Sequence, residues 1–143
     1  KYRQQIILQK KNLTIINDSK STSFSSSAGM LKKGSNILWL LGGIYKKGDK
    51  LELKKKDLSN VTAFIYGKNK NFFNNQLKSK VKLKNYKNLE DAVKNVFSII
   101  KTKRSVKYTI LFSPCAASFD SFKNFEERGL YFNQLVKRFM YGK

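Results

Sequence analysis

Three polar segments of this sequence carry residue types that bind anions, and each directly follows an apolar run. NDSKSTS at residues 17–23 follows LTII, GGIYKKGDK at 42–50 follows ILWLL, and SPCAASFD at 113–120 follows YTILF. Lysine amines and the free N–H groups at the start of a helix both attract carboxylates and phosphates. Together the segments predict a pocket of two lysines, hydroxyls and backbone amides, suited to a small anion with two carboxylates.

Each segment also has a simpler structural explanation. Asp, Ser and Thr in the first segment are good helix caps, although a cap does not account for Lys20. The second segment matches neither GxGxxG nor GxxxxGK[ST], so its glycines predict a tight turn rather than a dinucleotide fingerprint or a P-loop. In the third segment Pro114 ends a strand, and Ser118 or Asp120 is expected to cap the next helix. Phe122 is the phenylalanine of this region most expected in the core.

Strands and helices in alternation would bring these segments together. Two β-branched runs, at 4–8 and 13–17, are typical of an antiparallel hairpin. Further strands are expected at 36–41, 61–67, 81–83 and 108–113, and helices within 25–34 and at 71–78, 89–101 and 121–139. This order predicts one α/β domain over residues 1–143, with a mostly parallel sheet and helices on both faces. Such sheets bind ligands at the carboxyl ends of their strands, where all three polar segments begin.

The composition excludes several classes of site. With no histidine and a single cysteine, the chain cannot form a zinc site, a histidine-based catalytic triad or an internal disulfide. No apolar stretch approaches the roughly 20 residues that cross a bilayer. A lone cysteine fits a reducing compartment, so we expect a cytoplasmic protein without membrane attachment.

The formal net charge of +21 raises the alternative of a lysine-rich, nucleic-acid-binding α/β module. Only four of the 30 basic residues are arginine, which base readout and phosphate forks favour. The lysines are spread over the whole chain, as codon bias on a solvated surface would also produce. We therefore expect no specific nucleic-acid partner, and the composition leaves the alternative open.

Three motifs of this sequence resemble the C-terminal domain of the Mur ligases, over residues 17–129. In chain order they are NDSKST, LLGG followed by a lysine, and SPCAASFDSFKNFEERG. The third motif is specific, whereas the glycine pair alone is not. The form SFDSFKNFEERG favours the branch that adds D-glutamate over branches that add lysine or diaminopimelate. The resemblance implies a Rossmann-like, three-layer domain with about six strands, one of them an antiparallel N-terminal hairpin strand.

The resemblance further implies a step of peptidoglycan synthesis. In that step ATP phosphorylates the carboxylate of UDP-N-acetylmuramoyl-L-alanine, and the amine of D-glutamate attacks the acyl phosphate to form an amide. In such enzymes the C-terminal domain closes over a central ATPase domain, which holds most of the ATP and Mg²⁺. The motifs of that central domain and of the N-terminal UDP-binding domain are absent from these residues. A monomeric ligase is implied, in which those domains are the partners of this chain, and the chain alone is expected to be inactive.

Two implied roles concern ATP and catalysis. Asp18 would contact the ATP ribose. Lys20 would be the catalytic residue, because it would help to hold the substrate and the charge that develops on it. No metal ligand is implied within this chain.

The other implied roles concern D-glutamate. Thr22 and Lys46 would bind its α-carboxylate, and Ser118, with the backbone around Phe119 and Phe125, would bind its side-chain carboxylate. Lys46 is followed by a second lysine, and the resemblance favours Lys46 while leaving Lys47 open as the residue that contacts the substrate. Phe119 stands where a smaller aliphatic residue is also common in the family.

Overall fold

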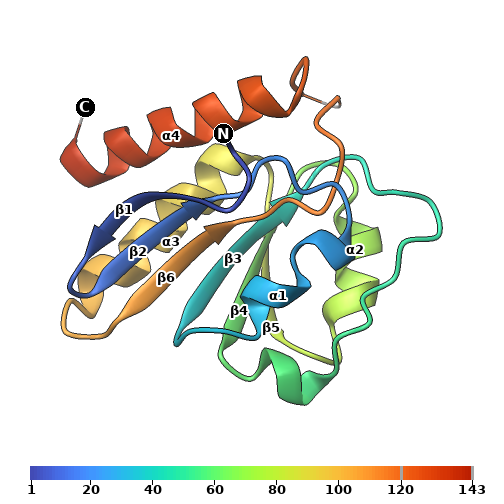
Figure 1. The fold of residues 1–143 in the computed structure, drawn as a ribbon, viewed down its shortest axis with the longest axis horizontal. Helices are drawn as coiled ribbons and strands as arrows, with labels where there is room; N and C mark the ends of the chain where they lie inside the picture. Colours follow the sequence, from blue (N-terminus) through green and yellow to red (C-terminus); the bar gives the residue numbers. More distant parts are fainter. Residues whose placement is uncertain (120, 143) are drawn as a thin grey trace.

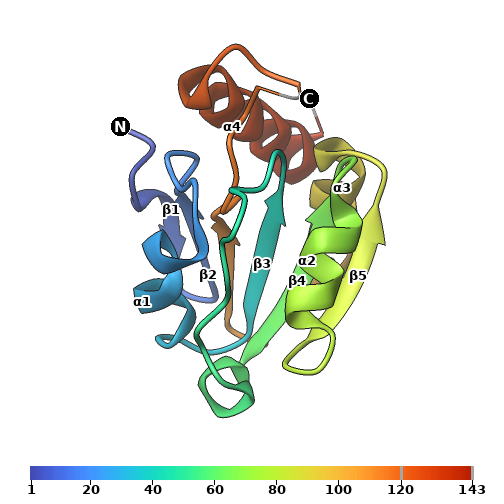
Figure 2. The ribbon, with the colours of Figure 1, turned by 90° about the vertical axis from the view of Figure 1, so that its right-hand side faces the viewer.

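The computed structural model describes residues 1–119 and 121–142 as a three-layer α/β fold (Figure 1). Helices α3 (Leu89–Thr102) and α4 (Phe125–Tyr141) cover one face of the sheet, and α1 (Ala28–Leu31) and α2 (Lys70–Leu77) cover the other (Figure 2). Short 3₁₀ turns lie at Phe24–Ser26 and Lys55–Leu58. The six strands are β1 (Gln5–Lys10), β2 (Leu13–Asn17), β3 (Ile37–Gly42), β4 (Val61–Tyr66), β5 (Lys82–Tyr86) and β6 (Tyr108–Phe112).

The strand order is β1-β2-β6-β3-β4-β5. All pairs are parallel except the N-terminal hairpin, in which β1 runs antiparallel to β2. The predicted Rossmann-like α/β class, with a mostly parallel six-stranded sheet, is therefore confirmed. Because β6 inserts between β2 and β3, the carboxyl ends of these three strands are neighbours, and the three polar segments start side by side.

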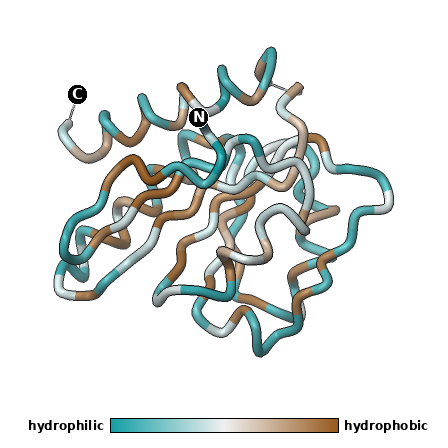
Figure 3. Tube along the Cα trace, viewed as in Figure 1, coloured by the Kyte–Doolittle hydropathy of each residue, from teal (hydrophilic) through white to brown (hydrophobic). Residues whose placement is uncertain are grey.

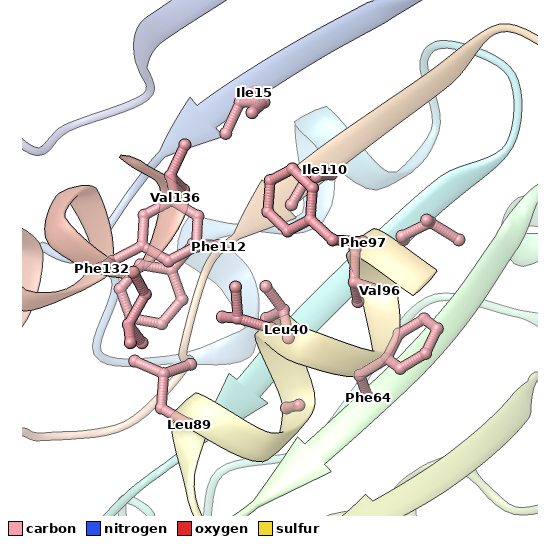
Figure 4. Close-up of a cluster of buried hydrophobic side chains, with 14 of the residues drawn as sticks. Ile15, Leu40, Phe64, Leu89, Val96, Phe97, Ile110, Phe112, Phe132 and Val136 are labelled. Carbon is pink, nitrogen blue, oxygen red and sulfur yellow. The ribbon is translucent and has the colours of Figure 1, made fainter. Parts of the chain in front are cut away.

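Strand β3 is buried on both faces, as its continuous apolar sequence predicts. Leu38 and Leu40 pack into the cluster under α3 and α4, and Trp39 and Leu41 into the cluster under α1 and α2. Figure 4 shows Leu40 among side chains from both helices and the neighbouring strands, and Figure 3 shows apolar residues following the sheet. The indole N–H of Trp39 also donates to the carbonyl of Ser113 at 2.8 Å. The close-packed core thus holds the edge that carries the polar segments.

Helix α4 begins at Phe125 rather than at the predicted residue 121. Its N-cap is Asn124, whose side chain accepts a hydrogen bond from the N–H of Glu127 at 2.8 Å. Before it, the carbonyl of Ser118 accepts from the N–H of Phe122 at 2.9 Å and closes a separate turn. Ser118 is therefore not the cap of this helix, and Asp120, the other predicted cap, lies outside the described residues.

Phe122, predicted in the core, is only half-buried. Its ring packs on Tyr131 of α4 with 5.5 Å between the ring centroids, and it belongs to neither of the two core clusters. The prediction was wrong because it assumed that the helix already included this residue. In the turn before α4 the side chain no longer follows the helical spacing that would direct it inward.

Candidate functional site

The three polar segments meet at the carboxyl edge of the sheet, and we call them the first loop (residues 18–23), the second loop (43–50) and the third loop (113–124). The N–H of Asp18 donates to the carbonyl of Phe112 at 2.7 Å, which joins the first loop to the end of β6, directly before the third loop. Ile44 and Ala117 exchange backbone hydrogen bonds of 3.1 and 2.9 Å, which join the second loop to the third. The convergence predicted from the sequence is present in the structure.

The buried polar side chains of the described residues all lie at this edge or on the first turns of α4 beside it. They are Asn17, Asp18, Ser19, Ser21, Ser27, Ser113, Ser118 and Arg128. A buried polar group is unfavourable unless it is hydrogen-bonded, and most of the protein interior avoids such groups. Their concentration at one edge is typical of a binding site, in which a few polar groups are held in fixed positions.

A chain of hydrogen bonds fixes Asp18 at the start of the first loop. Its Oδ1 accepts from the N–H of Gln4 at 2.9 Å and its Oδ2 from the hydroxyl of Ser113 at 2.7 Å. The Ser113 hydroxyl also bonds to that of Ser27, which lies 3.1 Å from the Cys115 sulfur. Burial raises the pKa of Asp18 above its usual value, and the bonds from Ser113 and Gln4 offset this only in part. The carboxylate is thus rigidly oriented and keeps acceptor positions for a ligand hydroxyl.

Lys20 lies in the exposed part of the first loop. Its Nζ is 5.3 Å from the centroid of the Phe125 ring, a cation–π contact with the first residue of α4. Its backbone N–H donates to the carbonyl of Tyr2 at 2.9 Å, so the N-terminal segment holds its main chain. Lys20 and Asp18 line a small pocket of about 40 Å³, and Thr22, two residues further on, is exposed. The structure therefore brings Asp18, Lys20 and Phe125 together.

The second loop can pack closely against the third because Gly43 has no side chain. Its φ is +124°, and a Cβ built on it would lie 2.7 Å from the carbonyl oxygen of Ala117. Lys46 and Lys47 follow and are both exposed. The loop thus presents two neighbouring amines beside the third loop, and the backbone geometry does not distinguish between them.

The third loop combines a buried hydroxyl with an exposed ring. Ser118 is 4% exposed, whereas Phe119 is 71% exposed. Phe125, at the start of α4, is half-buried, and its carbonyl accepts from the hydroxyl of Ser19 at 2.7 Å. Ser118 and Phe125 are therefore built into the edge, whereas the Phe119 ring extends from it.

Reasoning from the sequence missed Arg128, which is 1% exposed although it is charged. From α4 its guanidinium donates to the Ser19 carbonyl at 2.5 Å, to the Ser19 hydroxyl at 3.1 Å and to the Ala116 carbonyl at 2.9 Å. The one feature of the sequence that could have pointed to Arg128 was its residue type, arginine rather than lysine. In a chain that uses lysine at most basic positions, each of the four arginines is a candidate for a place where several donors act at once, and Arg128 is one of them.

Among the described residues, the pocket found at the predicted site is the small one of about 40 Å³ lined by Asp18 and Lys20. A larger hollow of about 340 Å³ lies at the same edge beyond β4 and β5, and it is lined by Lys68, Lys87, Phe122, Tyr131 and their neighbours. None of the predicted site residues lines it. Thr22, Lys46 and Phe119 are instead each exposed, and a ligand bound to them would need a second surface opposite to exclude water.

Two further findings concern the described residues as a whole. No three of their cysteine, aspartate or glutamate side chains gather in a group that could ligate a metal ion. None of their helices combines the length and the apolar character that a bilayer span requires.

Comparison with known proteins gives relatives but no match to a family model. UDP-N-acetylmuramoylalanine--D-glutamate ligase of Wolbachia sp. subsp. Brugia malayi is 36% identical over 139 residues, which cover 96% of this chain and 28% of the relative. Enzymes of the same name from Rickettsia felis and Hydrogenobaculum sp. are 36% and 37% identical, again over 96% of this chain, and it covers 30% and 33% of their lengths. The chain thus spans a third or less of these curated relatives, and it belongs to the Mur ligase family.

Proposed function

We propose that this chain is the C-terminal, amino-acid-binding domain of a ligase that adds D-glutamate to UDP-N-acetylmuramoyl-L-alanine. The observation that carries the proposal is the meeting of the three motif segments at one sheet edge, where exposed lysines lie on the same loops as a cluster of buried polar side chains. The identity of 36% to D-glutamate ligases over nearly the whole chain favours this function over the nucleic-acid-binding module.

In this proposal the chain binds and orients D-glutamate. Thr22 and Lys46 hold the α-carboxylate, while Ser118 and the backbone near Phe119 and Phe125 hold the side-chain carboxylate. Two carboxylates held by the three loops fix the direction of the amine between them, so that it faces the acyl phosphate. Holding the two reactants in place supplies much of the rate enhancement in such a reaction. Lys20 balances the negative charge that develops on the substrate.

ATP, bound with Mg²⁺, supplies the phosphoryl group that activates the substrate carboxylate. Asp18 fits the sugar of a nucleotide, because its carboxylate lies at a small pocket with oriented acceptor positions for a hydroxyl. We place the ligands of Mg²⁺ in the central domain of the full-length protein, with the P-loop. The exposed Lys46 and Phe119 fit a site that is completed when this domain closes over the central one in a cytoplasmic, monomeric enzyme.

The test is phosphate release by the full-length protein with ATP, Mg²⁺ and UDP-N-acetylmuramoyl-L-alanine, with and without D-glutamate. Release that requires D-glutamate supports the proposal, and the chain 1–143 alone should release none. Release that requires lysine or diaminopimelate instead would reject the D-glutamate assignment. Absence of release together with tight, steeply salt-dependent binding of DNA or RNA would favour the nucleic-acid module.

A further inference from the structure

Arg128 connects the first loop with the third, and we propose that it is the positioning residue that sets Lys20 relative to Ser118. This inference rests on the proposed function, because Lys20 and Ser118 bind substrate only there. Arg128 is 1% exposed, so it acts through the loops and does not touch the ligand.

On the first loop, the guanidinium holds the main chain on both sides of Lys20. Nη2 donates to the carbonyl of Ser19 at 2.5 Å and makes a longer contact of 3.5 Å with the carbonyl of Ser21. Nε donates to the hydroxyl of Ser19 at 3.1 Å. With the carbonyls before and after it held by one rigid group, Lys20 keeps a fixed backbone position while its amine remains exposed.

On the third loop, Nη1 donates to the carbonyl of Ala116 at 2.9 Å, two residues before Ser118. The second loop passes the same nitrogen, since a Cβ built on Gly43 would lie 3.5 Å from it. One planar group therefore fixes the distance between the first and third loops and packs beside the second loop.

The base of this side chain is itself anchored. The hydroxyl of Ser19 donates to the carbonyl of Phe125 at 2.7 Å, and the amide of Asn17 donates to the carbonyl of Gly129 at 3.0 Å. Both contacts hold the first turns of α4 against the end of β2. Movement of α4 would thus be transmitted to Lys20 through Arg128.

Only an arginine can make this set of contacts. Its guanidinium presents five N–H donors in one rigid plane, whereas a lysine has three donors on one flexible tip and cannot reach acceptors in both loops. Burial of a charge is also unfavourable for stability, and apolar replacements of buried charged groups are often neutral or stabilising. A buried guanidinium bonded to two substrate-binding loops is therefore better explained by their positioning than by stability.

The test compares Arg128→Lys with Arg138→Lys in the full-length protein. Arg138 is a matched control, because it lies on the same helix but is 45% exposed and pairs with Glu90 at 3.2 Å. For Arg128→Lys we expect the KM for D-glutamate to rise and kcat/KM to fall about 100-fold, the scale of a misplacement of about 1 Å. All constants of Arg138→Lys should stay unchanged.

A purely structural role gives a different result. It would lower kcat in proportion to the fraction of folded enzyme and leave the KM for D-glutamate unchanged, which would overturn the proposal. Should Arg128→Lys not fold, Ser19→Ala serves instead, because it removes the acceptor of Nε and the bond to Phe125. An unchanged KM in that variant would equally overturn it. If the wild-type protein shows no dependence on D-glutamate, the proposed function fails first, and the two failures remain distinguishable.

Discussion

Ile44 and Ala117 face each other across two backbone hydrogen bonds, 3.1 and 2.9 Å long, in the loops that follow β3 and β6. Strands β3 and β6 pair in parallel, and the loops that leave them then pair antiparallel. Lys46 lies two residues after one partner of this bridge, and Ser118 directly follows the other. The loops that carry Lys46 and Ser118, each proposed to bind one carboxylate of D-glutamate, are thus fixed to each other by main-chain bonds.

Gly43→Ala should break this arrangement. The new Cβ would lie 2.7 Å from the Ala117 carbonyl oxygen, at a φ of +124° that other residues rarely adopt. We expect the free energy of unfolding to fall by about 1–3 kcal/mol, measured by urea denaturation of the chain. Gly29→Ala is the control, because it lies in α1 and its new Cβ would meet no atom within 4 Å beyond its chain neighbours and its own helix backbone. It should be neutral or stabilising by up to about 1 kcal/mol. Equal effects of both changes would contradict the close approach.

Lys46→Ala should raise the KM of the full-length protein for D-glutamate. Loss of one charge-assisted hydrogen bond costs about 1.5–3 kcal/mol, or roughly 10- to 150-fold. The adjacent Lys47→Ala removes the same charge from the same exposed loop and should change the KM less than about threefold. A larger effect at Lys47 than at Lys46 would assign the carboxylate contact to Lys47 instead.

The stability of the chain should depend on pH through Asp18. Burial raises the pKa of its carboxyl in the folded state, so the folded chain holds this proton more tightly than the unfolded chain does. Its contribution is fully present below about pH 4, the usual aspartate range, and is lost as pH rises through the folded pKa. Asp18→Asn keeps an acceptor for Gln4 and can donate to Ser113. Relative to this variant, the wild-type chain should lose stability as pH rises from 4 to neutral, measured by urea denaturation at each pH. Parallel curves would show that Asp18 does not titrate in this way.

Cys115 should not react with iodoacetamide in the folded chain. It is fully buried, and burial raises the pKa of its thiol to about 12, although bonds from Ser27 and Ser21 counteract this. Because the thiolate is the reactive form, mass spectrometry should detect no adduct at pH 8 and one adduct after unfolding in urea. Labelling of the native chain at a rate near that of the unfolded chain would mean that the third loop opens readily.

Elements set by local pattern were predicted well from the sequence. The apolar run of β3 and the β-branched hairpin appear where expected, because burial and strand propensity act along consecutive residues. The start of α4 was not predicted correctly, since Ser118, Asp120 and Asn124 are all good caps and the sequence alone does not choose among them. The turn closed by the Ser118 carbonyl favours Asn124.

The candidate site was likewise predicted in part: its loops were found from local pattern, and its long-range contacts were not. The three loops were found because each follows a strand, and a parallel sheet brings such loops to one edge. Arg128 was missed because its burial depends on Ser19, 109 residues earlier in the sequence. The exposure of Phe119 likewise follows from the turn before α4. Contacts of this range are determined by the packed fold and leave no periodic signal in the sequence.

The edge strand β5 gives the lysine-rich composition a further consequence. It forms one border of the sheet, and its sequence, KLKNY, places exposed Lys82 and Lys84 on either side of the half-buried Leu83. An open strand edge can recruit a strand of another molecule, and charges along it oppose such growth by mutual repulsion. Whatever the origin of the net charge of +21, the lysines that contribute to it on β5 are expected to oppose aggregation through this edge.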